Sequence, residues 1–355
     1  MTNKPVREQS SSQVLPKRIL MVRLDRIGDL VLTLPIDQAL THADVRWWIP
    51  KGLSFITDAA EPPRHTTEIL KDVSLSQFLQ LLKCVRKARF EACVIFHAPW
   101  WVSLLTWLAG IRLRIGVKSQ WHSLLFLNRA VRQKRSRAEC SELEYNYRLV
   151  EDGLRIERGS LPRMSLPLRS PFNDFQCASL LSQYGLTKNR FYVVHPGMSG
   201  SALNWPTDHY LQLITLLSEQ GPVAITGTPS DEEFLKPLRA PLRGNANVMW
   251  LDGKLSGPEL ISVLSSAKAV VAPSTGVMHL AASTGSRTLG LFSPVRVQQP
   301  LRWGPQGAQT KTLKPNVVCP GELRFLGEVC PHYTSTNACM NQITPTQVLE
   351  ELRGW

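Results

Sequence analysis

Short apolar runs rich in β-branched residues alternate with helix-like stretches along both halves of the 355-residue chain. Such alternation is typical of βαβ units, in which each crossover returns the chain to a parallel strand of the same sheet. The predicted strands cover residues 18–24, 45–50, 92–97, 191–197, 222–227, 248–253, 269–273 and 288–294. The predicted helices cover residues 30–41 and 76–88, and further helices open near Pro206, Pro229, Pro258 and Gly276. We therefore expect an α/β protein with two doubly wound parallel sheets.

The length of the chain favours two domains, at roughly 150 residues per domain. The proline-containing stretch at residues 159–174 has no periodicity and is the expected linker. We expect a disordered tail at residues 1–16, followed by two Rossmann-like domains at 17–170 and 171–355 that face each other across a cleft. The last helix, at residues 346–353, is expected to pack back across the domains.

Positive charge is concentrated in the first half of the chain. The whole chain has 41 Lys and Arg against 28 Asp and Glu, and residues 1–170 hold 27 of the basic and 16 of the acidic residues. This excess points to an anionic partner, which is nucleic acid, an acidic membrane surface or a phosphorylated substrate. The basic residues are not arranged as in a known nucleic-acid module, which disfavours the first of these. A hydrophobic content of 43% excludes disordered and fibrous proteins.

The seven cysteines are an odd number spread over a long chain, which is typical of a reducing compartment. The polar N-terminus has no signal-peptide pattern, and we expect a cytoplasmic protein. The apolar stretch at residues 92–111 is interrupted by His97 and Pro99. We expect a buried strand, a loop and a helix there in place of a membrane span.

Three cysteines and a histidine near the C-terminus raise the alternative of a zinc site. They are Cys319, Cys330, His332 and Cys339. Their spacing lacks a Cys-x-x-Cys pair, so a buried structural cluster is favoured and no metal is predicted.

Ligands of doubly wound sheets bind at the carboxyl ends of the strands, so the loops there are the candidate sites. The first such loop, at residues 23–29, ends in Gly28 and Asp29. Gly28 permits a tight turn, and Asp29 falls at the start of a predicted helix, where the dipole stabilises a carboxylate. Asp29 is either a helix N-cap or a general base that faces the cleft.

Two further loops precede helices in the second half. The loop at residues 195–206 carries Ser199, Gly200 and Ser201, whose N–H groups and hydroxyls can cradle a diphosphate, although an ordinary flexible loop has the same composition. The loop at residues 273–281 carries Ser274, Thr275 and His279. Ser274 or Thr275 can be simply a helix cap, and His279 a buried histidine.

Taken together, these loops resemble glycosyltransferase family 9, the lipopolysaccharide heptosyltransferases. The resemblance rests on three motifs in this order, which are RLDRIGDLVLTLP, HPGMSGSALNWPTDHY and APSTGVMHLAASTGSRTLGLFSP. It implies a GT-B fold and a metal-independent, inverting transfer of heptose from an ADP-sugar to the lipopolysaccharide inner core. It also implies that the first domain binds the acceptor and the second binds the donor nucleotide, with no cofactor beyond the ADP-sugar co-substrate.

The resemblance also implies roles for individual residues. Asp29 corresponds to the family's catalytic base. The residues implied in donor binding are Ser199, Gly200, Ser201, Glu232, Ser274, Thr275, Gly276 and His279. Glu232 is chosen among three acidic residues after the second strand of the donor domain, although all three can instead be solvent-facing charges at a helix start. The residues implied in acceptor binding are Arg26, Arg112 and Arg114.

The chain departs from the family pattern at two places. Leu203 and Asn204 stand where members usually carry a basic pair that contacts the donor phosphate, and Ser274 stands where many have Asp. Three explanations remain open, which are a different donor or acceptor, another basic residue in the same role, and a weak or catalytically silent relative. A charge-assisted phosphate contact contributes roughly 1.5–3 kcal/mol, so the loss matters.

The excess positive charge is densest in one stretch of the first half, which comprises Arg112, Arg114, Lys118, Arg129, Arg132, Lys134, Arg135 and Arg137. This stretch is either a solvated basic face or a surface for the phosphorylated lipopolysaccharide core and the anionic inner leaflet. The second alternative predicts a peripheral location on the inner face of the inner membrane.

Overall fold

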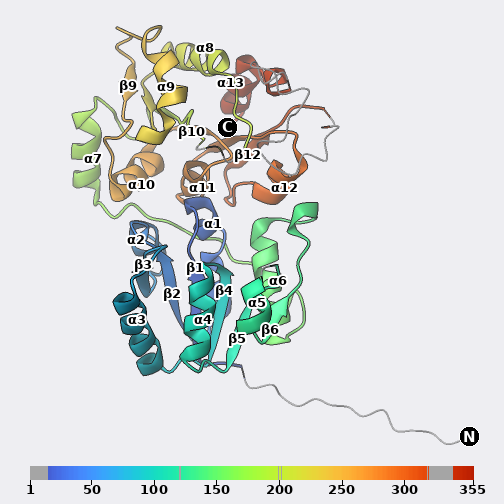
Figure 1. The fold of residues 1–355 in the computed structure, drawn as a ribbon. Helices are drawn as coiled ribbons and strands as arrows, with labels where there is room; N and C mark the ends of the chain where they lie inside the picture. Colours follow the sequence, from blue (N-terminus) through green and yellow to red (C-terminus); the bar gives the residue numbers. More distant parts are fainter. Residues whose placement is uncertain (1–14, 120, 199, 201, 318, 320–338) are drawn as a thin grey trace, which may run out of the picture.

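The computed structural model describes residues 15–119, 121–198, 200, 202–317, 319 and 339–355, and it has two α/β halves, one above the other (Figure 1). The strands of the first half are β1 (Arg18–Arg23), β2 (Asp44–Pro50), β3 (Thr66–Ile69), β4 (Ala92–His97), β5 (Leu113–Val117) and β6 (Arg129–Val131). Its helices are α1 (Ile27–Val31), η1 (Leu34–Ala39), α2 (Ser54–Asp58), α3 (Leu75–Ala88), α4 (Trp100–Leu108), α5 (Trp121–Phe126), η2 (Arg135–Arg137) and α6 (Glu142–Leu154).

The second half repeats the alternation. Its strands are β7 (Tyr192–Val194), β8 (Val223–Ile225), β9 (Val248–Trp250), β10 (Ala269–Pro273), β11 (Thr288–Leu291) and β12 (Thr310–Leu313). Its helices are α7 (Asp174–Gln183), α8 (Thr207–Ser218), η3 (Pro229–Asp231), α9 (Glu232–Arg239), α10 (Gly257–Ser266), α11 (Gly276–Ser283), η4 (Arg296–Gln298), α12 (Pro300–Trp303), η5 (Met340–Gln342) and α13 (Pro345–Arg353).

Both sheets have the same topology. The strand orders are β3-β2-β1-β4-β5-β6 and β12-β11-β10-β7-β8-β9, and all pairs within the sheets are parallel. Each order reverses direction beside the first strand of its half, between β1 and β4 and between β7 and β10. Because ligands bind at such switch points, the topology places both candidate crevices at the facing edges of the two sheets. The predicted α/β fold with two Rossmann-like sheets is confirmed.

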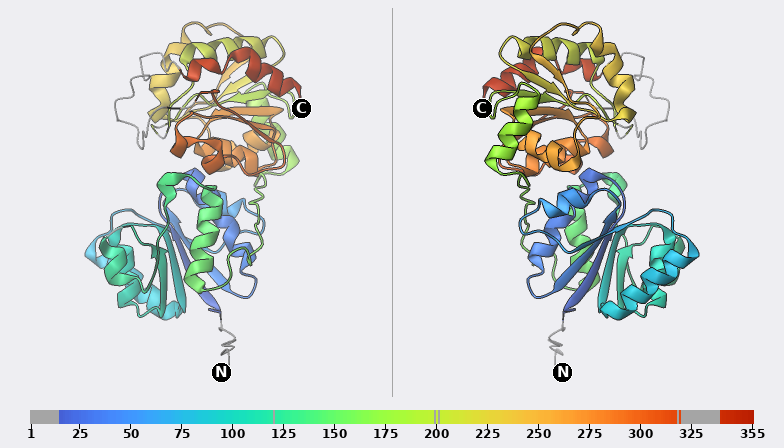
Figure 2. Two further views of the ribbon diagram at one scale, coloured as in Figure 1. Left: turned by 90° about the vertical axis from the view of Figure 1, so that its right-hand side faces the viewer. Right: turned by 90° about the vertical axis from the view of Figure 1, so that its left-hand side faces the viewer.

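Apolar side chains on both faces of each sheet explain why the strands are near-continuous hydrophobic runs. In the first half, α3, α4 and α5 cover one face of the sheet, and α1 and α6 cover the other (Figure 2). Trp47 of β2 is fully buried, stacks on Phe96 at a centroid distance of 6.1 Å and donates its indole N–H to Asp37. The ring thus contributes a large apolar area without leaving its polar atom unpaired.

The first predicted helix differs from the observed one. Residues 30–41 were expected to be a single helix, but the chain forms α1 from Ile27 and then a separate 3₁₀ helix, η1. Pro35 explains the break, because it lacks an N–H donor and disfavours the α conformation at the preceding residue. The earlier start puts Asp29 inside the first turn of α1. The strands β3, β5, β6 and β12 were not predicted, so each described sheet has more strands than the sequence pattern indicated.

The last helix, α13, lies on its own half. It packs against α8 and β11, and Val348 and Leu352 join the core of the second sheet. The prediction that it packs back across the domains is therefore wrong, because its apolar face is already buried on α8. The boundary at residues 170/171 falls between the two sheets and stays a prediction, and most of the predicted disordered tail lies outside the described residues.

The apolar stretch at residues 92–111 forms β4, a short turn and α4, as predicted. No helix in the described ranges is long and apolar enough to cross a membrane.

Candidate active site in the cleft

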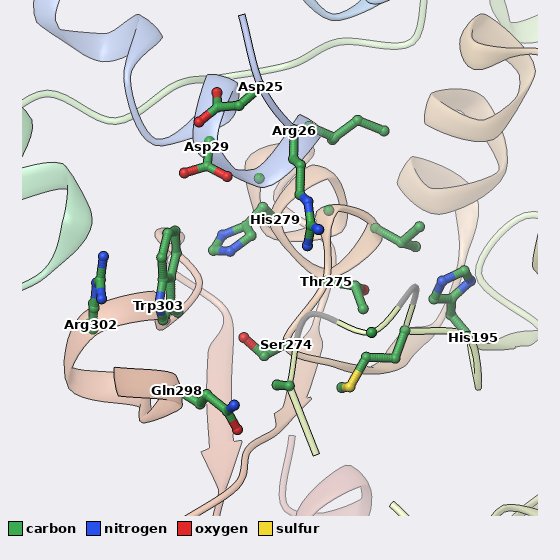
Figure 3. A pocket seen from close by; sticks show the side chains of 18 of the residues that line it. Asp25, Arg26, Asp29, His195, Ser274, Thr275, His279, Gln298, Arg302 and Trp303 are labelled. Carbon is green, nitrogen blue, oxygen red and sulfur yellow. The ribbon is translucent and has the colours of Figure 1, made fainter. Parts of the chain in front are cut away.

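A pocket of about 990 Å³ lies between the two halves, at the carboxyl ends of β1, β7 and β10 (Figure 3). The loop after β1 and the start of α1 form one wall. The loops after β7 and β10 and the segment around α12 form the facing walls. The three loops singled out in the sequence therefore meet in one cavity, as the switch-point rule predicts.

Two glycines allow the halves to approach each other closely. A Cβ atom on Gly28 would lie 2.7 Å from Cδ2 of His279, and one on Gly276 would lie 2.7 Å from Cβ of Ile27. Any larger side chain would force α1 and α11 apart. The tight contact places the N-terminal ends of both helices at the pocket, one from each half.

Asp29 lines the pocket, and Arg23 pairs with one of its two oxygens. Arg23, buried at the end of β1, forms an ion pair with Oδ1 of Asp29 and donates a 2.7 Å hydrogen bond to Asp25. Oδ2 of Asp29 has no hydrogen-bond partner within the described part of the chain. Burial raises the pKa of Asp29 to about 6, against the lowering effect of Arg23. The carboxyl group is thus fixed in place and binds a proton more readily than an exposed aspartate. The N-cap of α1 is Arg26, so the N-cap interpretation of Asp29 is wrong.

Glu142 connects this site to the other half of the molecule. It opens α6, is almost completely buried and forms ion pairs with Arg23, Arg135 and Arg302. Arg302, on α12, belongs to the second half, and its Nη2 lies 3.2 Å from Oε2 of Glu142. Burial alone would raise the pKa of Glu142, but the charges of Arg135, Arg23 and Arg302 together lower it. One carboxylate therefore holds three arginines around the pocket.

Three buried polar atoms on the pocket wall have no partner in the described part of the structure. They are Oγ1 of Thr275, Nδ1 of His279 and Oδ1 of Asp231. Thr275 is the N-cap of α11, yet its hydroxyl makes no capping bond. Burial lowers the pKa of His279 to about 4, so its ring is neutral at pH 7. Because buried polar groups are rarely left unpaired, these atoms make this wall of the pocket a candidate ligand-binding site.

Most of the predicted residues line this pocket. They are Arg26, Asp29, Gly200, Ser274, Thr275, Gly276 and His279. Ser199 and Ser201 lie outside the described residues. Gly200 has a backbone φ of +67°, a conformation that favours glycine.

Three predicted site residues do not reach the pocket. Glu232 is exposed and pairs with Arg239 at 3.1 Å, while its neighbour Asp231 faces the cavity. Arg112 and Arg114 lie at the amino end of β5, whereas the pocket lies at the carboxyl ends of the strands. Arg114 donates to the backbone oxygens of residues 111 and 126, so its guanidinium has a structural role. A strand-start or a helix-start position does not fix which way a side chain points, and the binding roles of these three residues stay predictions.

Several pocket residues were not assigned to the site from the sequence. Arg302 and Trp303 lie on α12, beyond the last of the three motifs. Glu142, which pairs with Arg135 and Arg302 of the pocket wall, is the first residue of α6 and belongs to none of the motifs. The sequence indicated Arg135 only as part of the basic stretch, but in the structure it lines the pocket. No local signal marks such residues, since only packing of the two halves brings them together.

Neither residue of the atypical pair can supply the missing cation. Leu203 and Asn204 are buried, and the Asn204 amide donates to Pro196 O at 2.7 Å and accepts from the backbone of Trp205 at 2.8 Å. Asn204 therefore stabilises the loop after β7 from inside.

The zinc alternative rests on residues that are only partly described. Cys330 and His332 lie outside the described residues, and Cys319 and Cys339 pack against the core of the second sheet. Among residues with assigned positions, no cluster of His, Cys, Asp and Glu is suited to a metal ion.

Comparison with known proteins gives one consistent family. The sequence model of glycosyltransferase family 9 (heptosyltransferase) matches residues 78–322. A putative glycosyltransferase of Haemophilus influenzae is 27% identical over 306 residues, 81% of this chain and 86% of the relative. Lipopolysaccharide heptosyltransferase 1 of Escherichia coli is 26% identical, over 78% of this chain and 88% of the relative. The structure of E. coli ADP-heptose lipopolysaccharide heptosyltransferase II superposes with a TM-score of 0.74 at 20% identity, over 95% of this chain and 98% of the other.

Proposed function

The chain belongs to glycosyltransferase family 9, and from this membership we propose that it transfers a heptose or a related sugar from an ADP-sugar to the inner core of lipopolysaccharide. The proposed reaction inverts the anomeric centre and uses no metal, and it takes place in the cytoplasm at the membrane that carries the acceptor. The observation that carries the proposal is the pairing, across one pocket, of a fixed carboxylate with three unpartnered buried polar atoms.

Asp29 is the proposed base. In an inverting displacement, a base takes the proton of the acceptor hydroxyl on the face opposite the leaving group. Asp29 lines the cavity from the first half, while Arg23 pairs with its Oδ1. The raised pKa makes the carboxylate a stronger base than an exposed aspartate while leaving it ionised at pH 7.

The start of α11 is the proposed site of the donor diphosphate. The first N–H groups of a helix have no partner within it, and the helix dipole favours an anion there. Thr275 adds a buried hydroxyl without a partner, and His279 adds a neutral ring. These groups meet the charge that develops on the leaving ADP. Asp231, rather than Glu232, is the carboxylate we assign to the donor's hydroxyl groups.

Arg26 is the proposed substitute for the missing basic pair. The resemblance assigned it to the acceptor, but its side chain extends from the start of α1 toward Thr275 and His279 (Figure 3). It makes no ion pair within the described residues, whereas Arg135 and Arg302 are both bound to Glu142. Arg26 can therefore reach the diphosphate from the opposite half.

The Arg26→Gln variant is expected to raise the KM for the donor by about 10- to 100-fold, because it loses a charge-assisted phosphate contact. The matched control is Arg46→Gln, which removes an exposed arginine paired with Asp44 on β2. Steady-state kinetics with varied donor check this. An unchanged donor KM, or an equal rise in the control, would contradict the role of Arg26.

The pH profile of transfer is expected to report Asp29. A carboxyl group with a pKa of about 6 is protonated below that pH and cannot accept a proton, so kcat/KM should fall about tenfold per pH unit below pH 6 and be level above it. An ordinary aspartate would hold activity down to about pH 4. Initial rates between pH 4.5 and 8 distinguish the two.

The overall proposal is tested by incubating purified protein with ADP-heptose and a heptose-deficient lipopolysaccharide acceptor and measuring ADP release. Transfer of the sugar to the acceptor supports the proposal. The absence of a cation at Leu203 and Asn204 favours a second candidate, a transferase of this family with another nucleotide-sugar donor or surface-glycan acceptor. A screen of nucleotide sugars separates the two, and nucleotide binding without any transfer would indicate a catalytically silent relative.

A further inference from the structure

The outer layer of the first half exposes an unusual number of large apolar side chains. Trp100 and Trp107 of α4 are 50% and 48% exposed, and Trp121, Leu124 and Leu125 of α5 are 60%, 63% and 65% exposed. Together with the partly exposed Leu108, these six residues form what we call the aromatic face. Such patches on soluble proteins mark interaction sites.

The aromatic face is continuous across the two helices. The rings of Trp100 and Trp121 are 6.3 Å apart at one end, and those of Trp107 and Phe126 are 5.8 Å apart at the other. Trp100 and Trp107 are seven residues apart, so they lie on the same side of α4. The opposite sides of α4 and α5 already supply the core, for example Trp101, Val102 and His122. The exposed side chains are therefore not needed to bury the sheet.

The segment of sequence that carries the aromatic face has charged residues of positive sign only. Residues 92–138 contain eight Lys and Arg and no Asp or Glu. Arg112 and Lys118, which lie on either side of β5 between the two helices, are exposed. Arg86 of α3 is also exposed and donates from Nη2 to the backbone oxygen of Leu108 at 3.0 Å, which holds its charge at the end of α4. An apolar surface with cations beside it is complementary to a surface with an apolar interior and anionic groups.

The structure separates this surface from the pocket. The helices α3, α4 and α5 lie on the outer face of the first sheet, away from α1 and α6 (Figure 2). No residue of α4 or α5 lines the cleft pocket. By contrast Arg135, part of the basic stretch expected to meet a membrane, is bound to Glu142 at the pocket. Arg112 and Lys118, by contrast, are exposed.

We propose that the aromatic face and its flanking cations dock this protein on an anionic lipid bilayer. Tryptophan side chains favour the headgroup region, leucines enter the adjoining acyl region, and Lys or Arg contact anionic headgroups. The inference deepens the proposed membrane location and rests on it, but it is independent of the chemistry of sugar transfer. Docking of this kind would orient the first half with its aromatic face toward the bilayer and the cleft beside the membrane surface.

Co-sedimentation with vesicles tests the docking surface. The wild-type protein is expected to bind vesicles of phosphatidylglycerol and phosphatidylethanolamine, and to bind phosphatidylcholine vesicles much more weakly. The Leu124→Gln/Leu125→Gln variant removes apolar contacts but keeps helix propensity, and its partition coefficient should fall about 30-fold or more. Arg112→Glu/Lys118→Glu should lower it about 20-fold or more, with the loss greatest at low salt.

Matched controls come from the second half. Phe175→Gln removes a side chain that is 82% exposed on α7, and Arg243→Glu/Lys254→Glu reverses two exposed cations. Both controls should bind vesicles like the wild type, and circular dichroism should show all variants folded. ADP affinity without vesicles should be the same in every variant. Loss of vesicle binding can therefore be distinguished from a failure of the proposed transfer reaction.

Two outcomes would overturn the proposal. The first is that the wild type fails to bind anionic vesicles, or that the α5 and charge variants bind as well as their controls. The second is that sedimentation equilibrium shows a dimer that the Leu124→Gln/Leu125→Gln variant loses, without vesicle binding, in which case the aromatic face binds a second copy of the chain.

Discussion

The Asp29→Asn variant is expected to lose about 10³-fold in kcat for sugar transfer while its ADP affinity stays unchanged, because general base catalysis typically contributes 10²- to 10⁴-fold. An amide cannot accept the acceptor's proton, yet it has nearly the same shape. It leaves the start of α11, where the donor is proposed to bind, untouched. Transfer kinetics and ADP titration on the same preparation measure the two effects separately.

Asp25→Asn is the matched control for this variant. Asp25 also lines the pocket and accepts a 2.7 Å hydrogen bond from the same arginine, Arg23, so it removes a similar charge from the same partner. If the proton acceptor is Asp29, the control should retain most of the transfer activity, and only Asp29→Asn should abolish the fall in activity below pH 6. Comparable losses in both variants would mean that a negative charge paired with Arg23 matters, rather than a base at Asp29.

The Glu142→Gln variant is expected to lower the free energy of unfolding by about 3–5 kcal/mol, the usual cost of breaking a buried ion pair by removing one partner. Glu142 is almost fully buried between Arg23, Arg135 and Arg302, and a neutral amide would leave three cations close together without their shared counterion. Urea denaturation at neutral pH measures the change.

The contribution of Glu142 should also depend on pH with a definite sign. Its pKa in the folded protein is lowered from 4.5, so the stabilisation is present above that value and is lost as the pH falls through the lowered one. The matched control is Glu144→Gln on the same helix, because Glu144 is more exposed and pairs with Arg148 and Arg163 at the surface. Such pairs contribute about 1 kcal/mol or less. A loss of under about 1 kcal/mol in Glu142→Gln would contradict the role of this carboxylate.

Glu142 also pairs with Arg302, a pocket residue of the second half. The Glu142→Gln variant should therefore affect catalysis as well as stability. Glu142 touches no proposed substrate position, so it is a positioning residue that acts through Arg23 on Asp29. Loss of Glu142 should shift the acid limb of the pH profile, whereas a purely structural role would lower activity equally at all pH values.

Local pattern predicted much of the fold. Apolar runs such as residues 92–97 and 269–273 became β4 and β10, because a strand buried on both faces must be apolar throughout. The start of α11 at Gly276 was predicted as well. The short edge strands β3 and β6 were not, since three or four half-exposed residues carry too little periodicity to be recognised.

The same contrast holds for the candidate site. The loops with Asp29, Gly200 and Thr275 could be found from the sequence, because each follows a predicted strand and the carboxyl ends of parallel strands share one edge. Asp231 rather than the predicted Glu232 lines the pocket, because adjacent residues at a helix start point in different directions and only packing against Gly197 shows which one faces inward. Arg112 and Arg114 do not line the pocket, because charge density along the sequence does not specify the end of the sheet at which a residue lies.

The sequence alone therefore determined the class of fold, the family and the three loops that carry chemistry, since these depend on order along the chain. The tertiary structure alone decided that Arg302 and Arg23 share Glu142, that Arg26 extends toward α11, and that α4 and α5 expose one aromatic face. These features depend on the contact of α1 with α11 through Gly28 and Gly276, and on which side of each helix is buried in the core. Both are settled by close packing between segments far apart in the sequence, which no local pattern records.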